Sequence, residues 1–91
     1  MPQPVYEYRI TSHAIVEMER RGIEESILRG VLAAPEQRHT VRAGRDVLQS
    51  RISFGDTIYL VRVFVDLDRT PADVVTVYRT RKIAKYWRAD P

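Results

Sequence analysis

The chain has 91 residues, of which 44% are hydrophobic and 30% are charged, so it can form one small globular domain and is not a disordered segment. Its net charge of +3 and isoelectric point near 9.6 favour a polyanionic partner. Cysteine is absent, which excludes disulfides and thiolate catalysis. With no secretory signal evident and only short apolar runs, we expect a cytoplasmic protein with no membrane partner.

The first half of the chain has the pattern of two helices. Thr11 or Ser12 can cap a helix that runs to about Arg21, and Gly22 supplies the left-handed residue that ends it. A second helix is expected over about 24–34, where apolar residues recur at helical spacing.

Beyond Pro35 the apolar pattern changes to alternation, which is typical of strands. Residues 5–10 also alternate and fit either a short strand or an extended lead-in. The sequence therefore predicts an α+β domain in which two helices pack on one face of an antiparallel sheet of about four strands. Strands are expected over 37–41, 46–54, 58–67 and 74–80, and a short amphipathic helix over 81–88.

His13, Glu17 and Arg20 form one polar stripe on the first helix. At about 100° per residue they lie within roughly 60° of each other. The stripe is either a solvated helix surface or half of an active site, in which the histidine moves a proton, the carboxylate orients it or acts as the second base, and the arginine stabilises charge. The apolar residues on the opposite side should face the core: Ala14, Ile15 and Met18.

A metal site has little support in the sequence. His13 and Glu17 have the spacing of two ligands on a helix, but no third ligand is evident and His39 is not placed to help. Glycine-rich phosphate loops and nucleophile elbows are also absent. We therefore expect no metal and no other cofactor.

Arg62 is a cation within an otherwise apolar strand, where burying it unpaired would cost free energy. It either extends to solvent, pairs with Glu17 or Asp66, or binds a phosphate group of a ligand. Arg51, on the preceding strand, could extend the same polar strip.

Tyr78 and Arg79 lie at the end of the last expected strand, a rigid but open position. They are either a half-buried tyrosine beside a solvated arginine or a pair of functional groups. In the second case the tyrosine would stack on a base or donate a hydrogen bond, and the arginine would neutralise charge on a reacting phosphate.

The C-terminal run RTRKIAKYWR (79–88) is strongly basic and contains no acidic residue. On the expected helix, Arg81, Lys85 and Arg88 share one face, with Ile83 and Trp87 on another. This face is either an ordinary solvated surface or a surface that binds RNA phosphates. The candidate RNA-binding residues are Arg51, Arg81, Lys82, Lys85 and Arg88.

Three segments carry a family resemblance: ITSHAIVEMERRGIEESILRGVLAAPE, YLVRVFVD and VVTVYRTRKIAKYW. The His-Ala start of the first helix, the Arg-Gly-Ile junction and the closing Thr-Val-Tyr strand resemble the domain-of-unknown-function family numbered 4258. The resemblance covers about residues 9–87, nearly the whole single domain. That family is similar to the RelE/BrnT-like toxins, small metal-independent ribonucleases of toxin–antitoxin pairs.

The resemblance implies a helical pair followed by a curved antiparallel sheet, RNA as substrate, and a small antitoxin protein that covers the site. Two assemblies are open alternatives, a homodimer and a hetero-oligomer with the antitoxin. Carried over by position, the family's helix-1 histidine falls on His13, its basic position before the glycine on Arg20 or Arg21, and its closing pair on Tyr78 and Thr80.

The leading hypothesis is a toxin-type endoribonuclease (a hydrolase acting on RNA) that cleaves by attack of a 2′-hydroxyl on the adjacent phosphate. The alternative from another class is a non-catalytic module that binds RNA or a protein through the basic segment. A small structural α+β protein without a ligand is the third possibility. The catalytic candidates are His13, Glu17, Arg20, Arg62, Tyr78 and Arg79.

Overall fold

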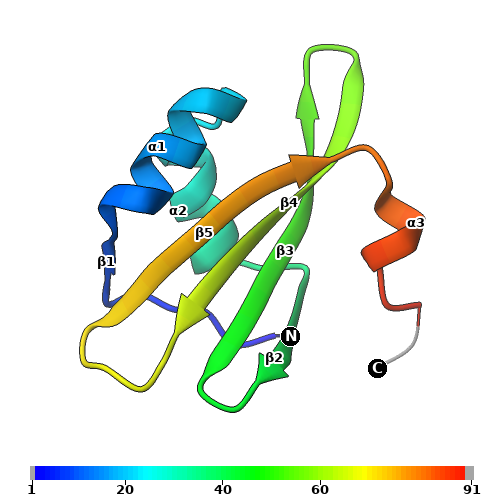
Figure 1. The fold of residues 1–91 in the computed structure, drawn as a ribbon. Helices are drawn as coiled ribbons and strands as arrows, with labels where there is room; N and C mark the ends of the chain where they lie inside the picture. The colour runs from blue at the N-terminus through cyan, green and yellow to red at the C-terminus, as the bar shows by residue number, and fades with distance from the viewer. Residues whose placement is uncertain (1, 90–91) are drawn as a thin grey trace.

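The structure is a computed structural model that describes residues 2–89, which form five strands and three helices (Figure 1). In chain order these are β1 (Tyr8–Ile10), α1 (Ser12–Arg21), α2 (Glu25–Ala33), β2 (Gln37–Arg42), β3 (Arg45–Phe54), β4 (Thr57–Asp66), β5 (Ala72–Thr80) and α3 (Ile83–Tyr86). The strands form one sheet of order β1-β5-β4-β3-β2. The α+β class expected from the sequence is confirmed.

The sheet differs from the expectation in strand number and in direction. Strands β2 to β5 are antiparallel neighbours, as expected, but β1 adds a fifth strand that runs parallel to β5. Tyr8 lies opposite Ala72, and Ile10 lies opposite Val74. Of the alternating segment 5–10, only the last three residues pair with the start of β5, and the rest is irregular.

The C-terminal helix is shorter than the sequence pattern indicates. A helix over 81–88 is expected, whereas only Ile83–Tyr86 is helical. Trp87 is already extended, with φ −76° and ψ 128°. The side chain of Gln37 explains this ending, because its Nε2 donates to the Arg88 carbonyl (2.5 Å) and its Oε1 accepts from the Arg88 N–H (3.1 Å). These bonds hold the following chain in extended form against β2.

The ends of α1 form as the sequence predicts. The Thr11 hydroxyl oxygen accepts a hydrogen bond from the N–H of Ala14 (3.2 Å) and donates one to the Val74 carbonyl (2.9 Å), so the cap also fastens the helix to β5. Gly22 ends the helix with φ +65°, in the left-handed region that favours glycine.

The two faces of the sheet have different coverings. On one face, Leu48, Val63 and Val77 lie side by side and join the core formed with the buried residues of α1 and α2. On the other face, Gln49 and Arg62 are cross-strand neighbours, and the α3 segment covers them in part. Because successive strand residues point to opposite faces, this division decides which predicted site residues can meet.

The substitution Thr11→Ala removes both side-chain bonds of the α1 cap. We expect it to lower the free energy of unfolding by about 1–2 kcal/mol, measured by urea unfolding, since N-cap replacements have this cost. Thr11→Ser keeps the hydroxyl and should retain most of the stability. Ser12→Ala changes an exposed neighbour and is the matched control. Equal unfolding midpoints for Thr11→Ala and Ser12→Ala would show that the cap contributes nothing.

Candidate functional site

Arg62 is a buried cation, and its side chain is fixed by neutral partners. The residue is 8% exposed. Its Nε donates to Gln49 Oε1 (2.8 Å) and its Nη1 donates to the hydroxyl of Tyr78 (2.8 Å). Within residues 2–89, no carboxylate forms an ion pair with it. A buried guanidinium usually has such a partner, so this one is an exception that calls for an explanation.

The two carboxylates considered as partners from the sequence are occupied elsewhere. Glu17 pairs with Arg20 and Arg21, and the carboxylate of Asp66 accepts two hydrogen bonds from Arg45 (2.6 and 3.1 Å). The expectation that Arg62 pairs with Glu17 or Asp66 is therefore wrong.

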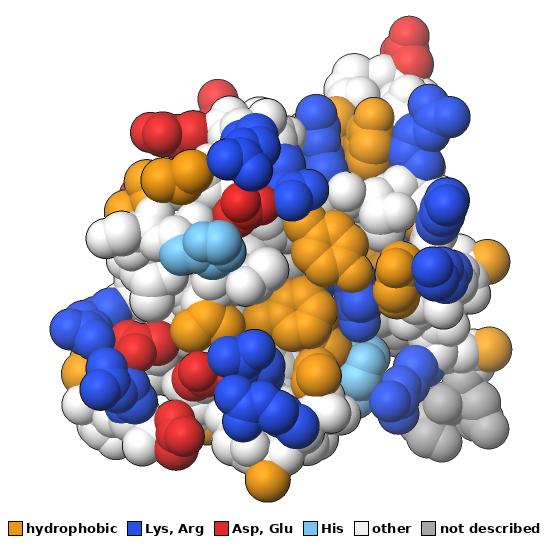
Figure 2. All heavy atoms as spheres, viewed as in Figure 1, with side chains coloured by type: hydrophobic (Ala, Val, Ile, Leu, Met, Phe, Trp, Pro, Cys, Tyr) orange, Lys and Arg blue, Asp and Glu red, His pale blue; other side chains and the backbone are white. Residues whose placement is uncertain are grey.

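Aromatic rings surround the Arg62 charge instead. Its Cζ lies 4.4 Å from the ring centroid of Tyr86, 5.3 Å from that of Phe64 and 5.8 Å from that of Tyr78. Ring faces attract a cation at these distances, which offsets part of the desolvation cost. Figure 2 shows basic and aromatic side chains gathered on one face, with a cationic side chain visible between the rings.

Tyr86 is a site residue that the sequence reasoning missed. Hydrogen bonding with Lys85 and with Tyr78 holds the pKa of its phenol below the usual value, and the nearby charges of Lys85 and Arg62 act in the same direction, while burial opposes them. The Tyr86 carbonyl accepts from Gln49 Nε2 (3.1 Å), which fastens α3 to the sheet. The sequence shows Tyr86 only as an aromatic residue within a basic run. The contact of its ring with Arg62 depends on how the chain folds back over the sheet.

The basic residues beyond β5 are placed differently from the expectation. Arg81, Lys85 and Arg88 do not share a helix face, because only one turn around Lys85 is helical. They are nevertheless exposed, as is Lys82, and within residues 2–89 none of the four pairs with a carboxylate.

Arg51 has both a carboxylate and an aromatic partner. Its guanidinium binds both carboxylate oxygens of Glu36 (3.0 and 2.9 Å), and its Cζ lies 4.1 Å from the ring centroid of Trp87. This ion pair lowers the pKa of Glu36 through the hydrogen bond from Arg51, against the effect of burial. The charge of Arg51 is therefore largely compensated within the protein.

The stripe on α1 is only partly exposed. His13 and Arg20 are exposed, but Glu17 is buried at 8% exposure, and Ile15, expected in the core, is 45% exposed. The hydrogen bond from Arg21 lowers the pKa of Glu17, with the charges of Arg21, Arg20 and His13 adding to this and burial opposing it. Glu17 is thus a fixed, ionised group.

Arg79 lies on the face opposite to Arg62 and Tyr78. Its Cζ is 4.2 Å from the ring centroid of Phe54 and 4.6 Å from that of Tyr59, and its Nη2 approaches Gly22 at the end of α1. The structure thus brings Arg62 and Tyr78 together with Tyr86, and separates them from Arg79.

The position of Thr80, suggested by the family resemblance, has a local structural contact. Its hydroxyl oxygen accepts from the N–H of Lys82 (3.1 Å), at the start of the segment that leads to α3.

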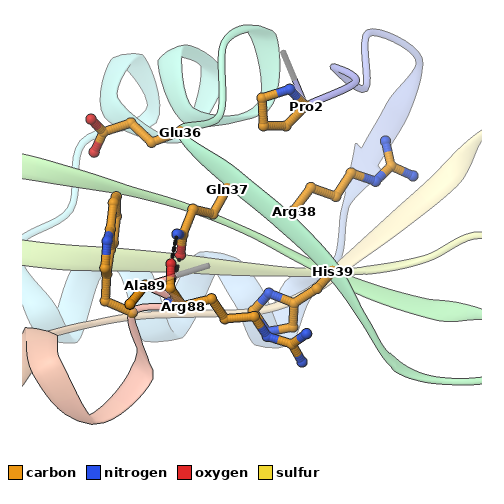
Figure 3. A pocket seen from close by; sticks show the side chains of 8 residues that line it. Pro2, Glu36, Gln37, Arg38, His39, Arg88 and Ala89 are labelled. Carbon is orange, nitrogen blue, oxygen red and sulfur yellow. Dashed lines mark hydrogen bonds between the residues drawn. The ribbon is translucent and has the colours of Figure 1, made fainter. Parts of the chain in front are cut away.

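A cavity of about 650 Å³ lies between the start of β2 and the segment after α3 (Figure 3). Gln37, His39, Trp87 and Arg88 contribute to its wall. The Nδ1 atom of His39 is buried and has no hydrogen-bond partner among the described residues. Burial lowers the pKa of this imidazole, as do the charges of Arg88 and Arg62, while Asp46 acts in the opposite direction.

Residues 2–89 contain no group of three or more histidine, aspartate or glutamate side chains arranged to hold a metal ion. In the same range no helix is long and apolar enough to cross a membrane. Comparison with known proteins gives no match to a protein-family model, to a curated protein or to a solved structure.

Acidification should destabilise the fold in two separate ranges. The lowered pKa of His39 means that below about pH 6.5 the unfolded chain takes up a proton that the folded chain does not, so stability falls from there. Glu17, Glu36 and Asp66 have lowered pKa values, so their stabilisation is lost only at lower pH, below about 4.5.

We therefore expect the melting temperature of His39→Phe to fall less than that of the unmodified protein between pH 7 and pH 5. Below pH 4.5 the two should fall together. Parallel curves across the whole range would contradict the burial of a neutral imidazole at this position.

Proposed function

We propose that this protein cleaves RNA without a metal ion, as a toxin-type endoribonuclease. The single observation that carries the proposal is the Arg62 guanidinium, buried without a carboxylate partner within residues 2–89 and bounded by the hydroxyl of Tyr78 and the ring of Tyr86. A cation kept in this state can neutralise a phosphate, whose charge increases during cleavage. The basic residues beyond β5, which form no ion pair within residues 2–89, supply further attraction for the RNA backbone.

In the proposed reaction the 2′-oxygen of a ribose attacks the adjacent phosphorus, and the bond from phosphorus to the 5′-oxygen breaks. Tyr86 accepts the proton of the 2′-hydroxyl, a role suited to a phenol whose pKa is lowered by Lys85 and Tyr78. Solvent water supplies the proton that the departing 5′-oxygen takes up. The products carry a 2′,3′-cyclic phosphate and a 5′-hydroxyl.

His13 is the rival proton carrier. It is exposed on α1, close enough to Glu17 for its charge to affect that carboxylate, and α1 packs against β5 on the face that carries Arg79, opposite to Tyr78. Glu17 and Arg20 would then fix the charge around the imidazole and not react themselves.

We also propose the finer RelE-like arrangement of the sheet and a small antitoxin protein that covers the basic face. A face with half-buried aromatic rings and with cations that have no ion-pair partner within residues 2–89 is suited to an acidic partner that competes with RNA. The second candidate function is a non-catalytic module that binds through the same face. It is favoured by the state of Glu17, because a carboxylate fixed in an ion pair is unsuited to act as a base.

Cleavage of a defined RNA by purified protein, followed by mapping of the new ends, tests the reaction. Tyr86→Phe should lower the cleavage rate by roughly 100-fold or more, the usual scale for loss of a general base, and should change RNA affinity little. Cleavage should persist in EDTA and leave cyclic phosphate ends. Tyr6→Phe, at an exposed tyrosine of the N-terminal segment, is the matched control.

The same assay on His13→Ala separates the two proton carriers. If His13→Ala abolishes cleavage and Tyr86→Phe does not, the acid–base role belongs to α1. RNA binding without any cleavage by the unmodified protein would contradict the enzyme and leave the binding module.

Removing the three expected phosphate contacts Arg81, Lys85 and Arg88 tests the basic segment. The triple change to glutamine should weaken RNA binding. It should also reduce the slope of log K against log salt concentration by the contribution of up to about three phosphate contacts. The fold should persist, since all three side chains are exposed. A triple change at Arg29, Arg42 and Arg69 removes the same charge elsewhere and is the control. An unchanged salt slope would show that the segment is an ordinary solvated surface that does not bind RNA.

A further inference from the structure

We propose that the cavity between β2 and the segment after α3 binds one nucleotide of a single-stranded RNA, adjacent to the phosphate held at Arg62. The inference rests on the proposed RNA substrate and adds to it a specific subsite. It does not require that the RNA be cleaved.

The size and the wall of the cavity suit a nucleotide. Its volume of about 650 Å³ is within the range of about 300–1,000 Å³ typical of small-molecule sites. The indole of Trp87 contributes an aromatic wall, and the guanidinium of Arg51, 4.1 Å from the ring centroid, holds that ring in place. Nucleobases stack on aromatic rings with little dependence on sequence.

His39 offers a hydrogen bond that the protein itself does not use. Its Nδ1 is buried and has no partner among the described residues, which is costly for a polar atom. Figure 3 shows the imidazole beside Arg88 at one end of the cavity. A neutral imidazole can donate or accept, as the edge of a nucleobase requires.

Among the described residues, the charges that line the cavity leave the Arg88 cation for a phosphate. Arg38 pairs with Asp46, and Glu36 pairs with Arg51, so these charges are compensated. The Arg88 side chain lines the cavity and has no carboxylate partner within residues 2–89.

Gln49 connects the cavity to Arg62. Its Nε2 donates to Gln37 Oε1 (2.8 Å), in the cavity wall, while its Oε1 accepts from Arg62 Nε (2.8 Å). Two bonds of one amide thus span from the cavity to the guanidinium. One side chain therefore links the cavity wall to the Arg62 guanidinium.

Trp87 is the single tryptophan of the chain, so its fluorescence reports directly on the cavity. Titration with nucleoside 5′-monophosphates should give a saturable change in emission, and inorganic phosphate alone should not. Arg88→Gln should weaken nucleotide binding by about 3- to 10-fold, the scale of one or two hydrogen bonds. Arg42→Gln removes the same charge from the far end of β2 and should leave the affinity unchanged.

His39→Phe separates a ligand-binding role from a structural one. It keeps a ring of similar size and removes the unpartnered nitrogen, so the melting temperature at pH 7 should stay equal or rise while nucleotide affinity falls by about 3- to 10-fold. His39→Gln retains a polar edge and should keep more of the affinity than His39→Phe.

The proposal is overturned if no nucleotide changes the Trp87 emission, if inorganic phosphate gives the same change as a nucleotide, or if His39→Phe loses stability and keeps its affinity. Saturable nucleotide binding by a protein that cleaves no RNA would support the subsite and reject the enzyme. Cleavage of RNA by a protein without nucleotide binding at Trp87 would support the enzyme and reject the subsite.

Discussion

The Arg62 guanidinium is buried with no carboxylate partner among the residues that the structure describes, and this side of the protein is organised around that constraint. Placing such a charge in the second face of the sheet costs free energy that its neighbours must offset. They do so with two hydrogen bonds to neutral groups, Gln49 and Tyr78, and with the ring faces that surround the charge. Neutral partners leave the positive charge uncancelled, whereas a carboxylate would have neutralised it.

The attachment of the C-terminal segment follows from the same set of contacts. No residue of α3 is buried, so apolar packing alone does little to hold it on the sheet. The side-chain amides of Gln37 and Gln49 bond to the backbone of Arg88 and Tyr86 and fix its position. These amides therefore place a lowered-pKa phenol over Arg62 and close one side of the cavity next to it.

Local patterns in the sequence were sufficient for most of the fold. The cap at Thr11, the left-handed Gly22 and the apolar alternation in β4 each act within a few residues, and the structure confirms them. The sequence left residues 5–10 undecided between a strand and an extended lead-in, because a three-residue pairing with Ala72–Val74 depends on a distant chain segment. The length of α3 was predicted wrongly for a similar reason, since the end of this helix depends on hydrogen bonds with the distant Gln37.

The site was less predictable than the fold. Alternation along β4 places Val61 and Val63 on the face opposite to Arg62, but the sequence grouping of Tyr78 with Arg79 ignores that adjacent strand residues point to opposite faces. Tyr86 and His39 gain their significance only from long-range contacts, one with Arg62 and one with a cavity closed by the returning chain. Periodicity carries no information on such contacts.

The central claim is that the Arg62 charge is kept for an anionic ligand and not for stability. The most direct measurement compares the melting temperatures of the unmodified protein and of Arg62→Met, each with and without a single-stranded oligoribonucleotide. Without RNA the account predicts that Arg62→Met lowers the free energy of unfolding by no more than about 1–3 kcal/mol, because the desolvated charge is removed while the buried Gln49 Oε1 loses its donor. It predicts that RNA raises the melting temperature of the unmodified protein alone. A large loss of stability in Arg62→Met, with the RNA-dependent rise intact, would contradict it.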